Sequence, residues 1–298
     1  MASTRIAMLE DRGVLAVSGA DRRAFLQGLV SNDIDKLSPD RAVYAALLTA
    51  QGKYLHDFMM IEHGNAIWLE TERARLGDLK RRLSLYRLRA RISIDERPEL
   101  AIAAVFGDAA PAALALPTEA GRGRPLDGGA AFVDPRLPEL GVRLITGREH
   151  LLRLVTDHNL ANTDFADYDR HRLALGVPDG SRDLVVEKSI LLESGFDELN
   201  GVDWQKGCYI GQELTARTKY RGLVKKRLFP VKIDGPPPPP DASIAGDGRE
   251  AGEMRSSSGD VGLALLRLDA VAAKNPLSAG GATLQPFVPS WMRIERDA

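Results

Sequence analysis

Cys208 is the only cysteine among 298 residues, and this restricts how the chain can be stabilised. A disulfide framework needs at least two cysteines, and a zinc or iron–sulfur cage within one chain usually needs three or four Cys or His ligands. The five histidines form no H-x-x-x-H or H-E-x-x-H pair. An apolar core must therefore hold the fold, and we predict no metal site within this chain alone.

Charge and hydropathy narrow the class of protein further. Lys and Arg number 40 and Asp and Glu 41, so the net charge of −1 excludes a wholly basic nucleic-acid binder. No apolar run reaches the roughly 18 residues of a membrane span. Glu10 and Asp11 lie where a signal peptide would be apolar. Together with the single free cysteine, these features predict a cytoplasmic protein without a membrane contact.

Hydrophobic periodicity predicts a mixture of strands and helices. Asp21 is expected to cap the first helix, and a hairpin is expected to turn at residues 63–65. The predicted strands are residues 14–19, 54–61, 66–70, 88–94, 100–106 and 142–146, and the predicted helices are residues 72–86 and 149–157. Because strands and helices alternate irregularly, we predict an α+β fold rather than a doubly wound parallel sheet.

A proline run predicts the clearest domain boundary. Gly235 is followed by five prolines, residues 236–240, which should form a stiff extended connector. Residues 261–268 beyond it have the composition of a strand. We therefore predict a large region over residues 1–230, a segment 231–240 ending in the connector, and a small β domain over 241–298. The Ala/Pro/Gly-rich residues 109–129 are expected to form a loop between halves of the large region.

The segment around Cys208 is the most informative one. It reads Asp-Trp-Gln-Lys-Gly-Cys-Tyr-Ile-Gly-Gln-Glu from residue 203 to residue 213. The residues after Cys208 favour a helix, so the thiol is expected at or just before a helix N-terminus, where the dipole and Lys206 favour a thiolate. A buried, inert thiol is the alternative that the residues alone leave open.

Lys206 to Glu213 match the K-G-C-Y-x-G-Q-E motif of the YgfZ-type folate-binding proteins of iron–sulfur cluster maturation. The match continues through residues 214–217 and 225–230, and upstream through Arg172, residues 175–180 and residues 182–184. Residues 25–28, Asn32 and residues 49–53 resemble the opening of the same family, which the glycine-cleavage T-protein shares. The chain looks similar to the mitochondrial branch of this family.

The resemblance implies a fold and a role. The fold would be aminomethyltransferase (T-protein)-like, with two interlocked α+β units and a small C-terminal β-barrel. The role would be assembly or repair of iron–sulfur clusters, chiefly 4Fe–4S, which indirectly supports tRNA modification. The implied cofactor is tetrahydrofolate, and the implied partners are an A-type iron–sulfur carrier protein and 4Fe–4S client enzymes. One cysteine cannot hold a 4Fe–4S cluster, so any iron–sulfur cluster would be shared with a partner or a second copy.

The candidate site residues follow from these motifs. The expected catalytic residues are Cys208, Lys206 and Asp57. The expected folate-binding residues are Asn32, Gln51, Arg172, Asp179 and Tyr209. The T-proteins carry a paired acidic motif near Asp57, and His56 takes one of its two places here. A solvent-facing strand residue at position 57 and an ordinary turn aspartate at position 179 are the simpler alternatives.

Two basic clusters leave other functions open. Residues 73–91 hold eight Lys or Arg against Asp78 alone, and residues 217–227 hold six and no acid. Either cluster suits a polyglutamate tail, an acidic carrier protein or RNA phosphates. Beside the iron–sulfur factor, we therefore consider a folate-dependent aminomethyl or one-carbon transferase using Asp57, and a tRNA-contacting protein.

Overall fold

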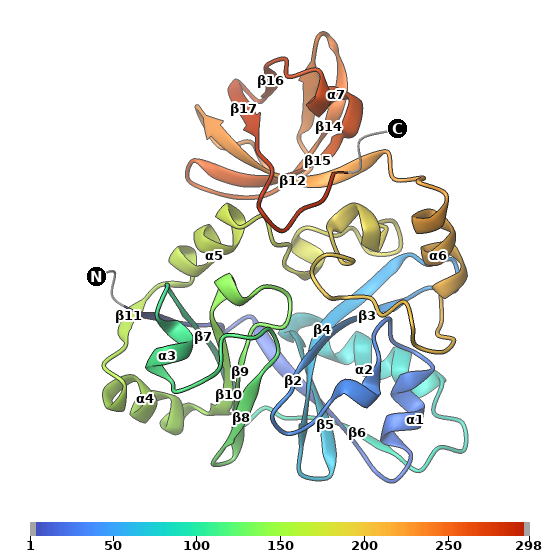
Figure 1. Ribbon diagram of the computed structural model, residues 1–298, viewed down its shortest axis with the longest axis vertical. Coiled ribbons are helices and arrows are strands. Elements are labelled where there is room, and N and C mark those ends of the chain that lie inside the picture. The colour runs from blue at the N-terminus through green and yellow to red at the C-terminus, as the bar shows by residue number, and fades with distance from the viewer. Residues whose placement is uncertain (1–3, 295–298) are drawn as a thin grey trace. The chain divides into compact units, whose positions relative to one another are not determined.

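The computed structural model describes residues 4–294, which divide into two compact units (Figure 1). The first unit contains the chain up to Leu48, then Leu55–Tyr168 and Asn200–Ile210. The second contains Thr49–Tyr54, Asp169–Leu199 and the chain from Gly211 onwards. Each unit is thus built from segments that are far apart in the sequence.

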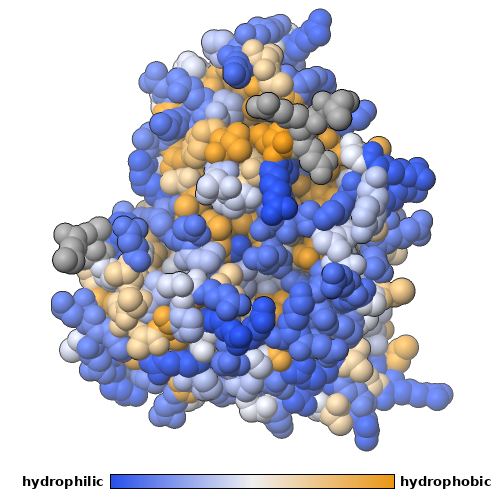
Figure 2. Space-filling model, viewed as in Figure 1, coloured by the Kyte–Doolittle hydropathy of each residue, from blue (hydrophilic) through white to orange (hydrophobic). Residues whose placement is uncertain are grey.

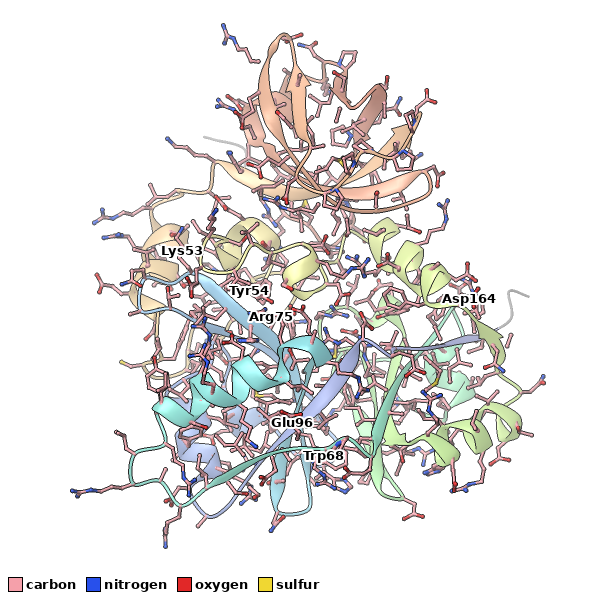
Figure 3. The ribbon with its side chains drawn as sticks, turned by 180° about the vertical axis from the view of Figure 1, so that it is seen from behind. Lys53, Tyr54, Trp68, Arg75, Glu96 and Asp164 are labelled. Atoms are coloured by element: carbon pink, nitrogen blue, oxygen red, sulfur yellow. The ribbon has the colours of Figure 1, made fainter. Side chains whose placement is uncertain are left out.

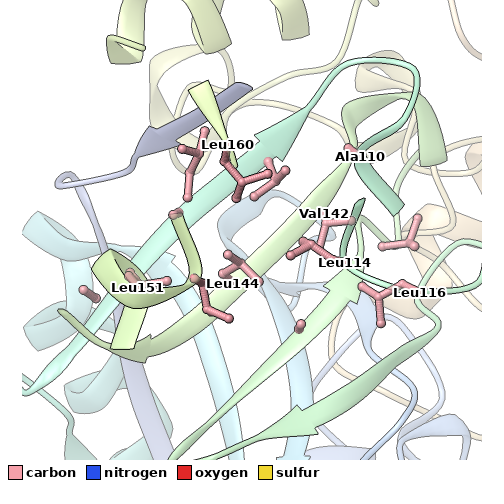
Figure 4. Close-up of a cluster of buried hydrophobic side chains, with 14 residues drawn as sticks. Ala110, Leu114, Leu116, Val142, Leu144, Leu151 and Leu160 are labelled. Atoms are coloured by element: carbon pink, nitrogen blue, oxygen red, sulfur yellow. The ribbon is translucent and has the colours of Figure 1, made fainter. Parts of the chain in front are cut away.

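One sheet of the first unit has the strand order β11-β1-β7-β10-β9-β8. Its strands are β1 (Arg5–Met8), β7 (Leu100–Phe106), β8 (Gly123–Leu126), β9 (Gly129–Val133), β10 (Val142–Gly147) and β11 (Ala161–Thr163). Helices α3 (Ala110–Ala113) and α4 (Arg148–Asp157) contribute to the apolar cluster beside it. Figure 4 shows Val142 and Leu144 of β10 in this cluster with Leu151 of α4. The expected strand–helix pair at residues 142–157 is confirmed.

The second sheet of this unit has the order β3-β4-β5-β2-β6. Its strands are β2 (Arg12–Ser18), β3 (Val43–Leu48), β4 (Tyr54–His63), β5 (Ala66–Glu72) and β6 (Ser93–Glu96), and its helices are α1 (Arg22–Gln27) and α2 (Leu76–Leu85). Trp68 of β5 and Glu96 of β6 mark this sheet in Figure 3. The predicted hairpin is confirmed, and Gly64 supplies the positive φ of 58° that its turn requires.

Two local predictions in this sheet are wrong. The strand expected over residues 88–94 exists only from Ser93, because Leu88 adopts a left-handed φ of 40° and is 90% exposed. Asp21 is the N-cap of α1, but its side chain makes no capping bond. Its carboxylate instead accepts from the backbone and guanidinium of Arg91, which ties the start of α1 to the segment before β6.

Buried charges connect the two sheets of the first unit. Glu70 of β5 accepts from Arg12 Nε at 2.5 Å, and its other oxygen lies 3.9 Å from Arg143 Nε on β10. Arg143 also bonds Asp134 at 3.4 Å, which pairs with Arg136 at 2.8 Å. Burial raises the pKa of Glu70, but the guanidiniums of Arg12 and Arg143 outweigh it and hold that pKa below its usual value. The carboxylates therefore remain charged inside the unit.

The second unit contains a closed barrel with the strand order β12-β15-β14-β13-β16-β17. Its strands are β12 (Lys226–Asp234), β13 (Ser243–Gly246), β14 (Arg249–Ser258), β15 (Val261–Arg267), β16 (Leu277–Ala279) and β17 (Ala282–Pro286). Phe229, Met254 and Leu266 are buried in its core, and Figure 2 shows further apolar side chains on the barrel face turned to the viewer. The unit also contains α6 (Gln212–Tyr220), α7 (Leu268–Ala272) and the end of α5 (Phe165–Ala174).

The proline run lies within the barrel and not before it. β12 pairs with both β15 and β17, so the barrel starts at Lys226, ahead of residues 236–240. The prolines connect β12 to β13, and the expected barrel start at residue 241 is corrected accordingly. No helix of the described chain is both long and apolar enough for a membrane crossing.

Arg172 holds the second unit together from a buried position. Its guanidinium bonds Asp169 at 2.7 Å, Asp183 at 2.5 Å and Ser256 Oγ on β14 at 2.9 Å. We expect Arg172→Leu to lower the free energy of unfolding by about 3–5 kcal/mol, because it removes the counter-charge of the buried Asp183 carboxylate.

Urea denaturation measures this change, with Arg170→Leu as the matched control. Arg170 lies two residues away on α5, is half exposed and forms its ion pair with exposed Asp260, so its loss should cost about 1 kcal/mol or less. Equal effects of the two substitutions would contradict the role given to Arg172.

His56 of β4 gives the first unit a specific acid sensitivity. Its Nε2 bonds Asp78 of α2 at 2.9 Å, so Nε2 carries the proton of a neutral ring. Burial lowers the pKa of His56 from 6.5 to about 4. Because the unfolded chain binds this proton more readily, we expect wild-type stability to fall as the pH drops from 6.5 to 4, by about 3 kcal/mol.

The measurement is the free energy of unfolding at several pH values for the wild type and for His56→Gln. The difference between the two proteins isolates this histidine from the titrating carboxylates. It should change across the window from pH 6.5 to 4 and stay constant above it. A constant difference throughout would contradict a buried neutral ring.

Candidate functional site

The segment that carries Cys208 is an irregular loop at the end of the first unit, residues 203–210. Asp203 starts it with a turn, since its Oδ1 accepts from the backbone N–H of Gln205 at 2.7 Å and of Lys206 at 3.0 Å. Its Oδ2 pairs with Lys36 Nζ at 2.5 Å. The loop is therefore fixed at its start by one carboxylate.

Lys206 anchors the same loop from inside the unit. Its ammonium donates to three backbone carbonyls, those of Gln27 at 2.9 Å, Val30 at 2.6 Å and Asn32 at 2.8 Å. Burial lowers the pKa of Lys206 to about 8, and Asp33 opposes this shift, so the side chain is cationic at neutral pH. The charge expected to stabilise a thiolate is thus directed at the carbonyls that follow α1.

Cys208 itself is an exposed free thiol. The alternative of a buried inert thiol is wrong for this residue. The prediction that Cys208 sits at or just before a helix start also needs correction, because α6 begins at Gln212 and its N-cap is Gly211, with a left-handed φ of 83°. Tyr209, next in the chain, is buried, and its ring centroid lies 5.2 Å from Lys206 Nζ.

Hydrogen bonds extend from Lys206 to Asp57. Asn32, whose carbonyl accepts from Lys206, donates its side-chain amide to the carbonyls of Tyr44 at 2.8 Å and of Asn200 at 2.7 Å. The Tyr44 hydroxyl donates to Asp57 Oδ2 at 2.8 Å. Asp57 is only 2% exposed, so the solvent-facing alternative for this aspartate is wrong. Lys206, Asn32 and Asp57, which were expected from separate motifs, therefore share one hydrogen-bond network.

A cavity of about 270 Å³ opens beside this network, within the first unit. Asn32 and Tyr44 line it. The remaining lining residues are Lys36, Arg41, Ala42, Val43, Glu119, Ala120, Pro135, Asn200 and Val202. Two cations, one carboxylate and two amides surround short apolar walls, a lining that suits a flat polar ring with an acidic substituent. Arg41 is half exposed, and its nearest acid, Glu119, is 4.0 Å away.

The other three expected ligand residues belong to the second unit. Gln51 is exposed in the turn between β3 and β4. Arg172 is 2% exposed, and its guanidinium is engaged by protein groups. Asp179 accepts from Arg182 at 3.2 Å and donates its backbone N–H to Asp183 at 2.8 Å. These contacts give Arg172 a structural role, whereas Gln51 is reachable from solvent.

Sequence reasoning missed Tyr44, Lys36 and Arg41. All of the residues from Val43 to Leu48 are buried, so no alternation marks Tyr44 as different from its neighbours. Asp203 had a signal, because it opens the cysteine motif three residues before Lys206. Its pairing with Lys36, 167 positions earlier, has no local trace in the sequence.

The basic clusters are partly neutralised. Asp78 bonds Arg81, Arg82 and His56, and lies 3.9 Å from Arg75. Figure 3 labels Arg75, which also donates to the Leu55 carbonyl at 2.7 Å. In the second cluster, Lys219 and Arg227 form ion pairs. Fewer cations are available to an acidic partner than the sequence suggests.

The chain is similar to known proteins over most of its length. Residues 225–294 match the family model described as CAF17, C-terminal beta-barrel domain. The chain is 37% identical to the human "Iron-sulfur cluster assembly factor IBA57, mitochondrial" and 35% identical to the mouse protein, over 95% of this chain and 84% of each relative. A crystal structure of the glycine cleavage system aminomethyltransferase T from Bartonella henselae aligns with a TM-score of 0.78. It covers 96% of this chain and 85% of that one at 15% identity, which shows a shared fold only.

These comparisons confirm the resemblance and the fold class expected from the sequence, an α+β T-protein-like fold with a C-terminal barrel. They contradict the expected cytoplasmic location, because the relatives are named as mitochondrial proteins. The acidic residues Glu10 and Asp11 therefore give no information about the compartment of the protein. The identity and coverage of the human and mouse relatives show that the chain belongs to the IBA57 family of iron–sulfur cluster assembly factors.

Proposed function

We propose that the protein is an accessory factor for the assembly or repair of iron–sulfur clusters, mainly 4Fe–4S, and that it acts through Cys208. Family membership supports the role in cluster assembly. The observation that carries the assignment to Cys208 is an exposed thiol on a loop whose start is fixed by Asp203 and Lys206. Such a thiol is accessible to another protein while its backbone stays ordered.

The thiolate of Cys208 would supply one ligand to a cluster that passes through a complex. The described residues contain no group of three or more His, Cys, Asp or Glu side chains able to hold a metal ion. The remaining ligands would therefore come from a partner protein or a second copy of this chain, and an A-type iron–sulfur carrier fits this requirement. The 4Fe–4S client enzymes would receive the cluster afterwards, so that any effect on tRNA modification is indirect.

We assign tetrahydrofolate to the cavity beside Asn32 and Tyr44. A pterin ring needs hydrogen-bond acceptors at its donor-rich edge, and Glu119 and the amide of Asn200 supply them. Arg41 suits a carboxylate of the glutamate tail, and Lys36 adds positive charge there although its ammonium already pairs with Asp203. When bound, tetrahydrofolate supplies nitrogen atoms that carry one-carbon groups. Tyr44 and Asn32 would hold the wall of the cavity in place through their bonds to Asp57 and Asn200.

The alanine substitution of Cys208 tests the assigned thiol. In a strain lacking this protein, we expect the wild type to restore the activity of a 4Fe–4S enzyme in aerobic extracts and Cys208→Ala to fail. Because the thiol is exposed, the free energy of unfolding of the variant should lie within about 0.5 kcal/mol of the wild-type value. Ser256→Ala, which alters a buried hydroxyl in the barrel, serves as a control that perturbs stability and not the thiol.

Rescue by both proteins would remove Cys208 from the mechanism. If the wild type also fails to restore the 4Fe–4S enzyme, cluster assembly is not the function of this protein. In that case the folate-dependent one-carbon transferase becomes the better hypothesis, and Asp57→Asn tests it by loss of transfer to tetrahydrofolate.

Arg41→Gln tests the folate cavity. The substitution removes a half-exposed guanidinium that faces the cavity, so we expect the affinity for tetrahydrofolate to fall about tenfold, as the loss of one charge-assisted hydrogen bond predicts. Isothermal titration calorimetry measures the change. Arg148→Gln is the matched control, because Arg148 is an exposed arginine of the same unit that pairs with Glu10 away from the cavity. An equal loss of affinity in both variants would show that the net charge of the protein, and not the cavity, determines the binding of tetrahydrofolate.

A further inference from the structure

The second unit contains a separate cavity of about 340 Å³ that the proposed function does not use. It is formed by the end of α6, the start of β12, α7 and the last described residues. Its apolar lining consists of Leu192, Val224, Leu268 and Ile294, and its polar lining of Asp197, Glu198, Thr218, Lys219, Arg227 and Arg293. This volume lies within the range of small-molecule sites.

Among the lining residues that the structure describes, the charged groups leave an excess of one positive charge. Asp197 pairs with Lys219 at 2.8 Å, and Glu198 pairs with Arg227 at 2.8 Å. Arg293 adds a third cation, so three cations face two carboxylates. A monoanion restores neutrality in such a pocket, whereas a dianion would face repulsion from Asp197 and Glu198.

Arg227 presents an unused hydrogen-bonding edge. Its Nη1 donates to Glu198 Oε1 and, at 2.9 Å, to the carbonyl of Arg293. Its Nε and Nη2 have no hydrogen-bond partner although both are buried and the residue is 9% exposed. Leaving two buried guanidinium donors unpaired is costly. The Nε–Nη2 edge carries two parallel N–H bonds, the geometry that binds both oxygens of one carboxylate.

We infer that this cavity binds the carboxylate of a small amphipathic acid. The carboxylate would accept from Nε and Nη2 of Arg227, and the apolar body would pack against Leu192, Leu268 and Ile294. The inference is independent of tetrahydrofolate, because the folate cavity belongs to the first unit. A free small acid and the C-terminal carboxylate of another chain offer the same chemistry, and the experiment separates them.

Hexanoate is the probe, and hexanamide is its uncharged counterpart. We expect hexanoate to bind the full-length protein and to shift the Nε–H resonance of Arg227 in NMR spectra, and hexanamide to bind at least tenfold more weakly. Arg227→Lys keeps the charge beside Glu198 but has no bidentate edge, so it should weaken hexanoate binding about tenfold or more. Arg217→Lys on α6 is the matched control, because Arg217 does not line the cavity.

A second variant fills the cavity without altering Arg227. Leu268→Trp should abolish hexanoate binding while the protein remains folded. Acetyl-Gly-Leu with a free carboxylate, compared with its amide, tests whether the cavity binds the C-terminus of another chain. If this peptide acid binds more tightly than hexanoate, the ligand is a chain terminus; if hexanoate binds more tightly, the ligand is a free small acid. Equal affinity for acids and amides, or no binding of either acid to the folded wild type, would overturn the inference.

Discussion

The ion pairs that join the two sheets of the first unit are the interaction on which its arrangement depends. Arg12 and Glu70 lie on neighbouring strands of one sheet, and Arg143 lies on β10 of the other. Removing one of these buried charges would weaken the compensation of the charges beside it, a larger loss than that of a surface pair. The sheets therefore meet in an arrangement in which each of these charges lies beside an opposite one.

This network also reaches the candidate site. Arg136, which pairs with Asp134, lies with its guanidinium carbon 5.6 Å from the centroid of the Tyr44 ring. Burial and the adjacent Asp57 raise the pKa of Tyr44 well above its usual value, so the phenol stays protonated and donates to Asp57. The wall of the cavity is thus held by the same charges that connect the sheets. The packing of the sheets and the position of this cavity wall therefore depend on the same buried charges.

The parts of the fold that depend on local patterns could be predicted. The hairpin of β4 and β5 has a turn glycine and apolar strands, and α2 has a regular apolar face. The failures have physical reasons. Arg and apolar residues alternate over positions 87–91, but no neighbouring strand pairs with them, so they form a mostly exposed turn. The prolines looked like a boundary because prolines break strands, yet a connection between two barrel strands needs the same property.

The site was predictable only where its residues share a motif. Cys208, Lys206 and Asp203 stand together in the sequence, whereas Tyr44, Lys36 and Arg41 are brought to the cavity by β3 and the loops around it. The role of Lys206 could not be read from its place beside the cysteine, because its three acceptors lie more than 170 positions earlier. Long-range backbone acceptors leave no trace in composition or spacing.

The anchoring of Lys206 has a consequence for the encounter with a partner. A thiol on a flexible loop loses backbone freedom when it is captured, at a cost of roughly 1–2 kcal/mol for each residue that becomes ordered. In this protein the three carbonyl bonds and the Asp203 turn have already removed much of that freedom. A group that captured the thiol would therefore meet a loop that is already ordered, so that binding would need little rearrangement of its backbone.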